Sequence, residues 1–188
     1  MGIKEHVIVA IDGMSAAGKS SLASLLRETY VCNVISMDFF FLRPVQRTPE
    51  RLAEPGGNID YERFLKEVAR PLNAGEAFCY RPYDCKIGEL TDSVSVCLNR
   101  LTVVEGVYSM HPYFNCAGDG GSGGRGLYDV SVFLSIDDVS QQRRLKERSP
   151  YLLERFVNEW IPMENTYFEH FRILEKCDLL FDSKEVQP

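Results

Sequence analysis

The stretch that most constrains this chain is GMSAAGKS at residues 13–20, which satisfies the pattern G-x-x-x-x-G-K-[ST]. The apolar run HVIVAI at 6–11 predicts a buried strand before it, and Leu22, Leu25 and Leu26 follow it at helical spacing. A strand, a glycine-rich loop and a helix in this order turn backbone N–H groups towards phosphate oxygens, with the positive end of the helix dipole behind them. The sequence therefore predicts a P-loop, against the alternative of an unrelated glycine turn.

The chemistry of a P-loop gives its residues distinct expected roles. Lys19 would reach the β- and γ-phosphates of a nucleotide, and the Ser20 hydroxyl would hold a magnesium ion. We therefore expect ATP and Mg²⁺ as the cofactors. The residues expected to bind the nucleotide are Gly13, Ser15, Ala16, Ala17, Gly18, Lys19, Ser20 and Ser21.

Strands alternate with helices along the rest of the chain. With 188 residues there is room for one α/β domain spanning 1–188, and the alternation predicts a three-layer fold with a mostly parallel sheet and helices on both faces. Further strands are expected at 33–37, 101–104, 128–136 and 178–181. Helices are expected at 20–31, from Asp60 towards Pro71, after Asp137 or Asp138, and at 151–176 with a break at Pro162. The remaining segments are expected to be irregular at 39–58, a hairpin excursion at 76–98 around Pro82, and a mobile glycine-rich loop at 115–126.

Composition and charge limit the partners. A formal net charge of −6 argues against a broad nucleic-acid surface. The chain contains no apolar run long enough for a bilayer and no signal-peptide layout at its start. Its six cysteines contain no C-x-x-C pair, so neither a zinc site nor a disulfide framework is indicated. We expect a cytoplasmic protein that binds a small molecule and neither nucleic acid nor membrane, and the sequence leaves a homo-oligomer open.

Two acidic residues follow expected strands, at the sheet edge where ligands of α/β proteins bind. Asp38 could accept a proton from an attacking hydroxyl and contribute to a metal site, or it could only cap a turn. Glu105 ends the run LTVV and could ligate magnesium directly or through water beside the acceptor, or it could only be solvated.

Three arginines occupy one expected helix, and the segment 138–150 could form a lid. Arg144 and Arg148 are four residues apart and share a face, with Arg143 beside them. Closed over ATP, such a lid could neutralise charge on the transferred phosphoryl group and exclude water. The alternative is a solvated surface helix in which Glu147 and Glu154 are the partners.

Several segments together resemble the uridine kinase family. They are the P-loop, MDFFFL from Met37, NIDYERF at 58–64, RPYD at 81–84, VVEGVYS at 103–109, and the RR-x3-R helix. The resemblance implies a kinase of the nucleoside and nucleotide type that transfers the ATP γ-phosphate to the 5'-hydroxyl of uridine or cytidine. It implies that Asp38 is the catalytic acidic residue, that Asp60 and Tyr83 hold the ribose and base, and that Lys19, Ser20, Glu105 and the arginines form the phosphate and metal machinery.

The chain departs from that family where the base would be read. Tyr83-Asp84 is followed by CKIG, whereas the family continues into a histidine and an arginine that read the pyrimidine. Another riboside, pantothenate or a sugar phosphate therefore stays open as the acceptor. A nucleotide-dependent regulatory ATPase is a further alternative, although it would need neither Asp38 nor the arginine helix.

Overall fold

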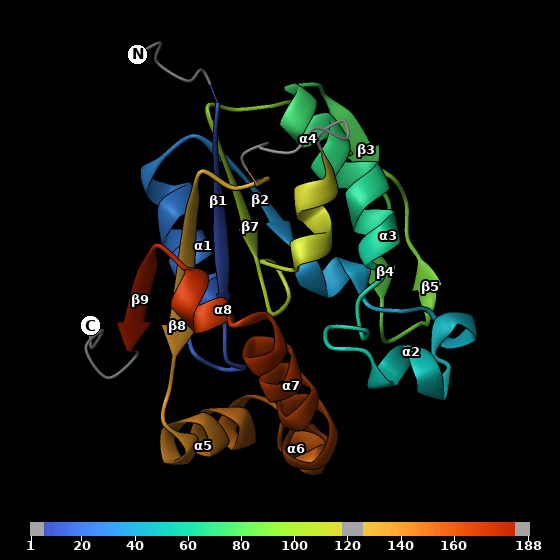
Figure 1. The fold of residues 1–188 in the computed structure, drawn as a ribbon, viewed down its shortest axis with the longest axis vertical. Coiled ribbons are helices and arrows are strands. Elements are labelled where there is room, and N and C mark those ends of the chain that lie inside the picture. Colours follow the sequence, from blue (N-terminus) through green and yellow to red (C-terminus); the bar gives the residue numbers. More distant parts are fainter. Residues whose placement is uncertain (1–5, 118–125, 183–188) are drawn as a thin grey trace.

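A parallel sheet of five strands lies at the centre of the computed structural model, which describes residues 6–117 and 126–182 (Figure 1). The strand order is β2-β7-β1-β8-β9, and every neighbouring pair is parallel. This confirms the predicted mostly parallel sheet. The strands are β1 (Val7–Gly13), β2 (Cys32–Ser36), β7 (Leu101–Glu105), β8 (Val130–Ser135) and β9 (Leu179–Asp182).

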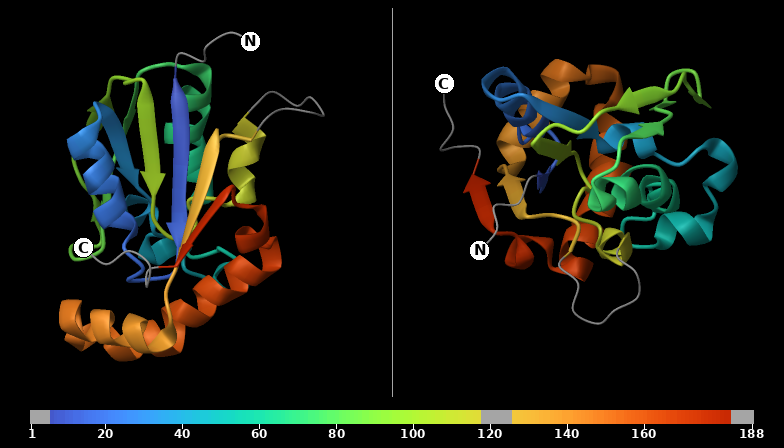
Figure 2. Two further views of the ribbon diagram at one scale, coloured as in Figure 1. Left: turned by 90° about the vertical axis from the view of Figure 1, so that its left-hand side faces the viewer. Right: turned by 90° about the horizontal axis from the view of Figure 1, so that it is seen from above.

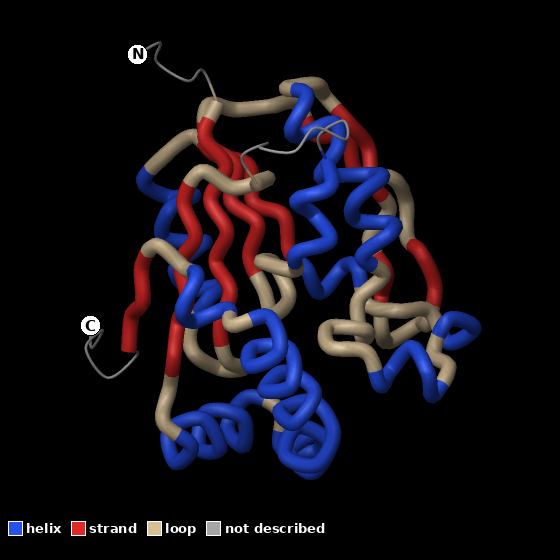
Figure 3. Tube along the Cα trace, in the orientation of Figure 1, coloured by secondary structure: helices blue, strands red, loops and turns tan. Residues whose placement is uncertain are grey.

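Helices cover both faces of this sheet, as Figure 2 and the tube of Figure 3 show. Adjacent strand residues point to opposite faces, so Val103 packs in one apolar cluster with α1 while Val104 packs in another with α3, α7 and α8. Burial on both faces explains the nearly continuous apolar strands in the sequence. The helices are α1 (Lys19–Thr29), α2 (Pro49–Ala53), α3 (Tyr61–Phe64), α4 (Arg70–Ala74), α5 (Asp138–Arg148), α6 (Leu153–Arg155), α7 (Ile161–Phe171) and α8 (Ile173–Lys176).

The P-loop joins β1 to α1, and its first glycine is required by close packing. Gly13 has a φ of 138°, and a Cβ there would lie 2.2 Å from the Leu134 carbonyl oxygen of β8. Only glycine fits this backbone against its neighbour. The chain can therefore turn out of the sheet at its carboxyl edge and begin α1 six residues later, with Leu22 and Leu26 packed on the sheet.

Helices α5, α6 and α7 lie below the carboxyl ends of the strands in Figure 1. Asp137 caps α5, because its Oδ1 accepts a hydrogen bond from the Ser140 N–H at 3.1 Å. The predicted cap after the fourth strand is therefore confirmed. Among residues 6–117 and 126–182, no helix combines the length and apolar character needed to cross a bilayer.

The predicted break at Pro162 is wrong. Pro162 lies in the first turn of α7, directly after a π-helical segment, Phe156–Trp160, and the chain stays helical through it. Pro71 likewise follows a π-helical segment, Leu65–Ala69, so the helix from Tyr61 runs past this proline to Ala74. A π turn widens the helix where proline has no N–H to donate and its ring would meet a carbonyl. The break instead falls at Arg172, which has a φ of 55°.

The excursion between Glu76 and Leu98 consists of two short antiparallel pairs, as its alternating pattern predicts. β3 (Phe78–Tyr80) pairs with β6 (Val94–Val96), and β4 (Tyr83–Asp84) pairs with β5 (Glu89–Leu90). The segment expected to be irregular also contains α2 and two 3₁₀ turns, at Met37–Phe40 and Pro44–Gln46. Pro112–Ala117 forms another 3₁₀ turn, and most of the expected glycine-rich loop, residues 118–125, lies outside the described part of the chain.

Candidate active site

One large cavity, of about 1580 Å³, lies at the carboxyl edge of the sheet. It gathers residues from the P-loop, the ends of β2 and β7, the β4–β5 hairpin, and the helices α5 to α7. Of the residues that the sequence analysis singled out, Gly13, Ala17, Asp60 and Arg143 are not part of its wall. Those that line it are Ser15, Ala16, Gly18, Lys19, Ser20, Ser21, Asp38, Tyr83, Glu105, Arg144 and Arg148.

Lys19 lies folded against its own loop. Its Nζ donates to the carbonyl oxygens of Gly13 and Met14, at 2.7 and 2.8 Å. Burial lowers the pKa of Lys19, while the charges of Glu164 and Asp12 oppose this shift. The ammonium is thus held at the centre of the loop, beside the backbone N–H groups that a phosphate would meet.

Ser15 connects the P-loop to two helices. Its N–H and its hydroxyl donate to the two oxygens of Glu164, on α7, at 3.1 and 2.6 Å, and its carbonyl accepts from Gln141 Nε2, on α5, at 2.9 Å. Burial raises the pKa of Glu164, and the nearby Lys19 charge counters this shift. Glu164 and Gln141 were not among the predicted site residues, because polar residues on a helix ordinarily predict a solvated face.

Asp12 is a second buried carboxylate that the sequence analysis passed over. It is fully buried and accepts from the N–H groups of Gly13, Tyr108 and Met110 and from the Tyr167 hydroxyl, at 2.7 to 3.2 Å. These bonds fix the start of the P-loop to the segment that follows β7. The signal available in the sequence was an Asp inside an apolar strand, directly before the motif.

Ser20 and Glu105 present oxygen atoms to each other. The Ser20 hydroxyl donates to Glu105 Oε2 at 2.9 Å. Gly106 lets the chain turn here, with a φ of 128°, and a Cβ in its place would lie 2.9 Å from Met37 Cβ. Asp38 lines the same cavity and interacts electrostatically with Glu105. A hydroxyl and two carboxylates provide the hard oxygen ligands that magnesium prefers.

This oxygen set fits a metal shared with a nucleotide and not a cage built by the protein alone. In the part of the chain that the structure describes, no group of three or more His, Cys, Asp or Glu side chains could hold a metal ion. Magnesium commonly keeps one or two protein carboxylates and completes its shell with water and substrate phosphates. Ser20, Glu105 and Asp38 suit that arrangement.

Asp38 lies in the 3₁₀ turn that follows β2, and its backbone N–H donates to Ser36 Oγ at 3.4 Å. The side chain faces the cavity and is exposed to it. Desolvation by the surrounding protein raises the pKa of Asp38, the Glu105 charge raises it further, and Lys19 and Arg148 oppose the shift. A carboxylate with a raised pKa is a stronger proton acceptor than an ordinary aspartate.

Only some of the arginines on α5 lie near the P-loop. Arg144 Nη1 donates to the Ala16 carbonyl at 3.1 Å, and Ala16 itself has a φ of 63°. Arg148 lines the cavity, with its guanidinium 5.7 Å from the Phe156 ring centre. Arg143 is exposed and lies outside the cavity wall, whereas Arg144 and Arg148 share the inward face that their spacing predicts.

The two residues expected to hold the acceptor are separated. Tyr83, at the start of β4, is buried and lines the cavity. Asp60 is also buried, but its Oδ1 caps α3 by accepting from the Arg63 N–H at 3.1 Å, and its Oδ2 accepts from Gln46 Nε2 at 2.8 Å. The Asp60 carboxylate thus already has protein partners and lies apart from the large cavity.

Comparison with solved structures places this architecture among P-loop kinases. A possible uridine kinase from Bacillus stearothermophilus superposes with a TM-score of 0.71 and 20% identity, over 97% of this chain and 91% of that one. A D-glycerate 3-kinase from Cryptococcus neoformans gives 0.58 and 14%, over 98% and 88%. A phosphoribulokinase from Rhodobacter sphaeroides gives 0.57 and 15%, over 96% and 71%. No family model and no curated protein matches the sequence.

These likenesses establish the fold. The chain has the α/β fold of P-loop kinases, with a Lys19-centred loop at the carboxyl edge of its sheet. The compared proteins differ among themselves in the acceptor that their names give, which leaves the acceptor of this chain to its own residues.

Proposed function

We propose that this protein is an ATP- and magnesium-dependent kinase that phosphorylates a hydroxyl group of a small metabolite. One observation carries the proposal: Asp38, a carboxylate with a raised pKa, faces the same cavity as Lys19 and the Ser20–Glu105 pair. A P-loop alone would suit any nucleotide-binding protein. A proton acceptor beside it suits transfer to an alcohol.

The residues divide the reaction between them. The P-loop and Lys19 hold the phosphates of ATP, and Arg144 and Arg148 neutralise charge on the transferred group. Asp38 accepts the proton of the attacking hydroxyl. The hydroxyl oxygen of the acceptor bonds to the γ-phosphorus, and the bond between this phosphorus and the β-γ bridging oxygen breaks, which releases ADP. Magnesium, held by Ser20, Glu105 and Asp38, would neutralise phosphate charge. The cavity is large enough to take both substrates.

The sequence resemblance favours a ribonucleoside, uridine or cytidine, as the acceptor. The position of Tyr83 in the cavity wall supports the binding of a planar base. Another riboside, pantothenate and a sugar phosphate are the alternatives. Asp60, which the resemblance assigns to the ribose, would need a rotamer change to leave Gln46 and the α3 cap and reach such a substrate.

The test is a screen for acceptor-dependent ADP formation with ATP, Mg²⁺ and purified protein. The acceptors are uridine, cytidine, pantothenate and phosphorylated and free sugars. We expect at least one of them to raise the ADP rate well above the rate without acceptor. An ADP rate that no acceptor changes would replace the kinase proposal with a nucleotide-dependent ATPase.

A further inference from the structure

Two basic side chains, Arg47 and Lys86, line the end of the cavity that is left for the acceptor. Arg47 follows the 3₁₀ turn Pro44–Gln46, and Lys86 lies in the turn between β4 and β5. They come from segments that are far apart in the sequence. Neither forms an ion pair with another residue of the described ranges 6–117 and 126–182 within 4 Å.

Both residues are exposed, and the Arg47 side chain and the Lys86 backbone each have one protein contact. Arg47 Nη2 lies 3.4 Å from Oδ1 of the buried residue Asn58. The Lys86 backbone N–H donates to Asp84 Oδ1 at 2.7 Å, which fixes the turn that carries the lysine. The Arg47 charge also acts on the thiol of Cys85, the residue next to Lys86, so the two cations belong to one region of the cavity.

Three other arginines have acidic partners. Arg51 pairs with Glu62 at 2.7 Å, Arg63 lies 3.6 Å from Asp60, and Arg155 pairs with Glu159 at 3.2 Å. Arg155 also lines the cavity, and the remaining basic residues of the wall, Lys19, Arg144 and Arg148, belong to the P-loop and the helix α5.

The carboxylates near the two cations have other partners or roles. Asp84 accepts the Lys86 N–H, and Asp38 faces the P-loop as the proposed proton acceptor. The acidic chain as a whole has more carboxylates than cations, with a net charge of −6. Two cations without an ion-pair partner in a cavity wall therefore point to a ligand that supplies the negative charge.

We propose that the acceptor alcohol carries an anionic group, a carboxylate or a phosphate, that Arg47 and Lys86 bind while its hydroxyl faces Asp38. This inference rests on the kinase function proposed above, and among its possible acceptors it favours an anionic one, such as pantothenate or a sugar phosphate, over the neutral nucleoside that the sequence resemblance suggests. The Arg47 guanidinium offers a planar set of donors for two oxygens of such a group, and the Lys86 ammonium adds a point charge. A neutral nucleoside would leave both cations without a partner.

The experiment compares pairs of alcohols that differ in charge. The pairs are pantothenate with panthenol, D-glycerate with glycerol, and ribose 5-phosphate with ribose, with uridine as a further neutral acceptor. In the unmodified protein we expect the charged member of at least one pair to have a kcat/KM about ten- to a hundredfold higher, as expected for charged hydrogen bonds. The carboxylate and phosphate pairs distinguish the two forms of the anion.

Two variants then locate the effect. Arg47→Gln and Lys86→Gln should each raise KM for the charged acceptor about tenfold or more, with kcat changed far less, since binding and not chemistry is lost. Arg70→Gln, at an exposed arginine of α4 outside the cavity, is the matched control and should change neither value. Affinity for a nonhydrolysable ATP analogue, measured by calorimetry, should be the same in all four proteins.

The outcomes separate this inference from the kinase proposal. If a neutral acceptor is phosphorylated best and neither substitution changes its KM, the inference of an anionic acceptor is wrong. The kinase proposal is unaffected by that result. Analogue binding without any acceptor-dependent ADP formation overturns the kinase proposal and this inference with it. An equal loss of ATP-analogue binding in Arg47→Gln and Lys86→Gln would move the two cations to the nucleotide and also overturn the inference.

Discussion

Glu164 of α7 accepts hydrogen bonds from both the N–H and the hydroxyl of Ser15, so a buried carboxylate holds the third residue of the P-loop. The Lys19 ammonium is the main favourable charge on Glu164. The P-loop is therefore joined to α7 by one side chain. This contact connects two residues that are 149 positions apart in the chain.

We predict that Glu164→Gln destabilises the protein by about 1.5 to 3 kcal/mol, because one charge-assisted bond to Ser15 is lost and Lys19 keeps less compensating charge. Urea unfolding followed by circular dichroism measures this change. Glu169→Gln, at an exposed position on the same helix, is the control and should stay within about 0.5 kcal/mol of the unmodified protein. Equal midpoints for Glu164→Gln and the control would mean that the Ser15 contact contributes nothing.

Asp38→Asn should lower kcat by about 10² to 10⁴ while ATP binding changes little, because the amide keeps the shape but cannot accept the proton. The direction of the pKa shift predicts the pH dependence. Since the pKa of Asp38 is raised above 3.8, activity should fall as the pH drops towards that raised value and Asp38 becomes protonated. Steady-state rates between pH 5 and 8 test both points. An unchanged kcat would reduce Asp38 to a turn residue.

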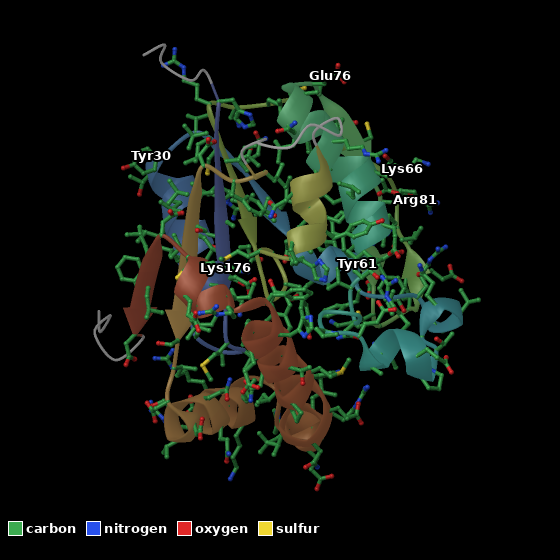
Figure 4. All side chains as sticks on the ribbon, viewed as in Figure 1. Tyr30, Tyr61, Lys66, Glu76, Arg81 and Lys176 are labelled. Carbon is green, nitrogen blue, oxygen red and sulfur yellow. The ribbon has the colours of Figure 1, made fainter. Side chains whose placement is uncertain are left out.

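His111 should make stability depend on pH. The ring is buried between Tyr61, labelled in Figure 4, at 4.9 Å and Tyr167 at 5.9 Å, and burial lowers the pKa of His111 to about 4. Its unfolded pKa is about 6.5, so below that pH the unfolded chain binds the proton more readily. Stability should therefore fall between about pH 6.5 and pH 4, by about 3 kcal/mol in total.

The measurement for His111 is the urea midpoint as a function of pH. His111→Phe keeps an aromatic ring in the stack and removes the titration, so its pH dependence in this window should be weaker than that of the unmodified protein. Parallel curves for the two proteins would contradict the assignment to His111.

Asp60→Ala distinguishes a structural role from a substrate role. The structure gives Asp60 the cap of α3, and loss of a cap should reduce stability by about 1 kcal/mol. If Asp60 also binds a ribose diol, as the family resemblance implies, the variant should lose a preference for ribosides over 2'-deoxyribosides of about tenfold. Rates on one such pair, in both proteins, decide the question. A cap alone would leave the ratio unchanged.

The sheet and the P-loop could be predicted because their signals are local. An apolar strand followed by GMSAAGKS, and acidic residues directly after two other strands, place Lys19, Asp38 and Glu105 at one edge of any parallel sheet. The partners of these residues could not be predicted in the same way. Glu164 and Gln141 are polar residues on helices, and only the packing of α5 and α7 on the P-loop turns them inward.

The wrong break at Pro162 has a similar cause. A proline in a helical pattern predicts an end or a kink, but a π-helical segment before it relieves the clash, and such a segment leaves no local signal in the sequence. The role of Asp60 could not be predicted from local sequence either. Its position before a helix fits both a cap and a substrate ligand, and only Gln46 and Arg63 in the folded chain reveal what its carboxylate contacts.

The most direct test of the account follows the γ-phosphate of isotopically labelled ATP in the presence of the best acceptor from the screen. We predict that the label appears in a phosphate ester of the acceptor, in equal amount to ADP, and that Lys19→Ala, which removes the ammonium at the P-loop, abolishes this transfer. Label found only as inorganic phosphate, at a rate indifferent to the acceptor, would contradict phosphoryl transfer to an alcohol and show an ATPase instead.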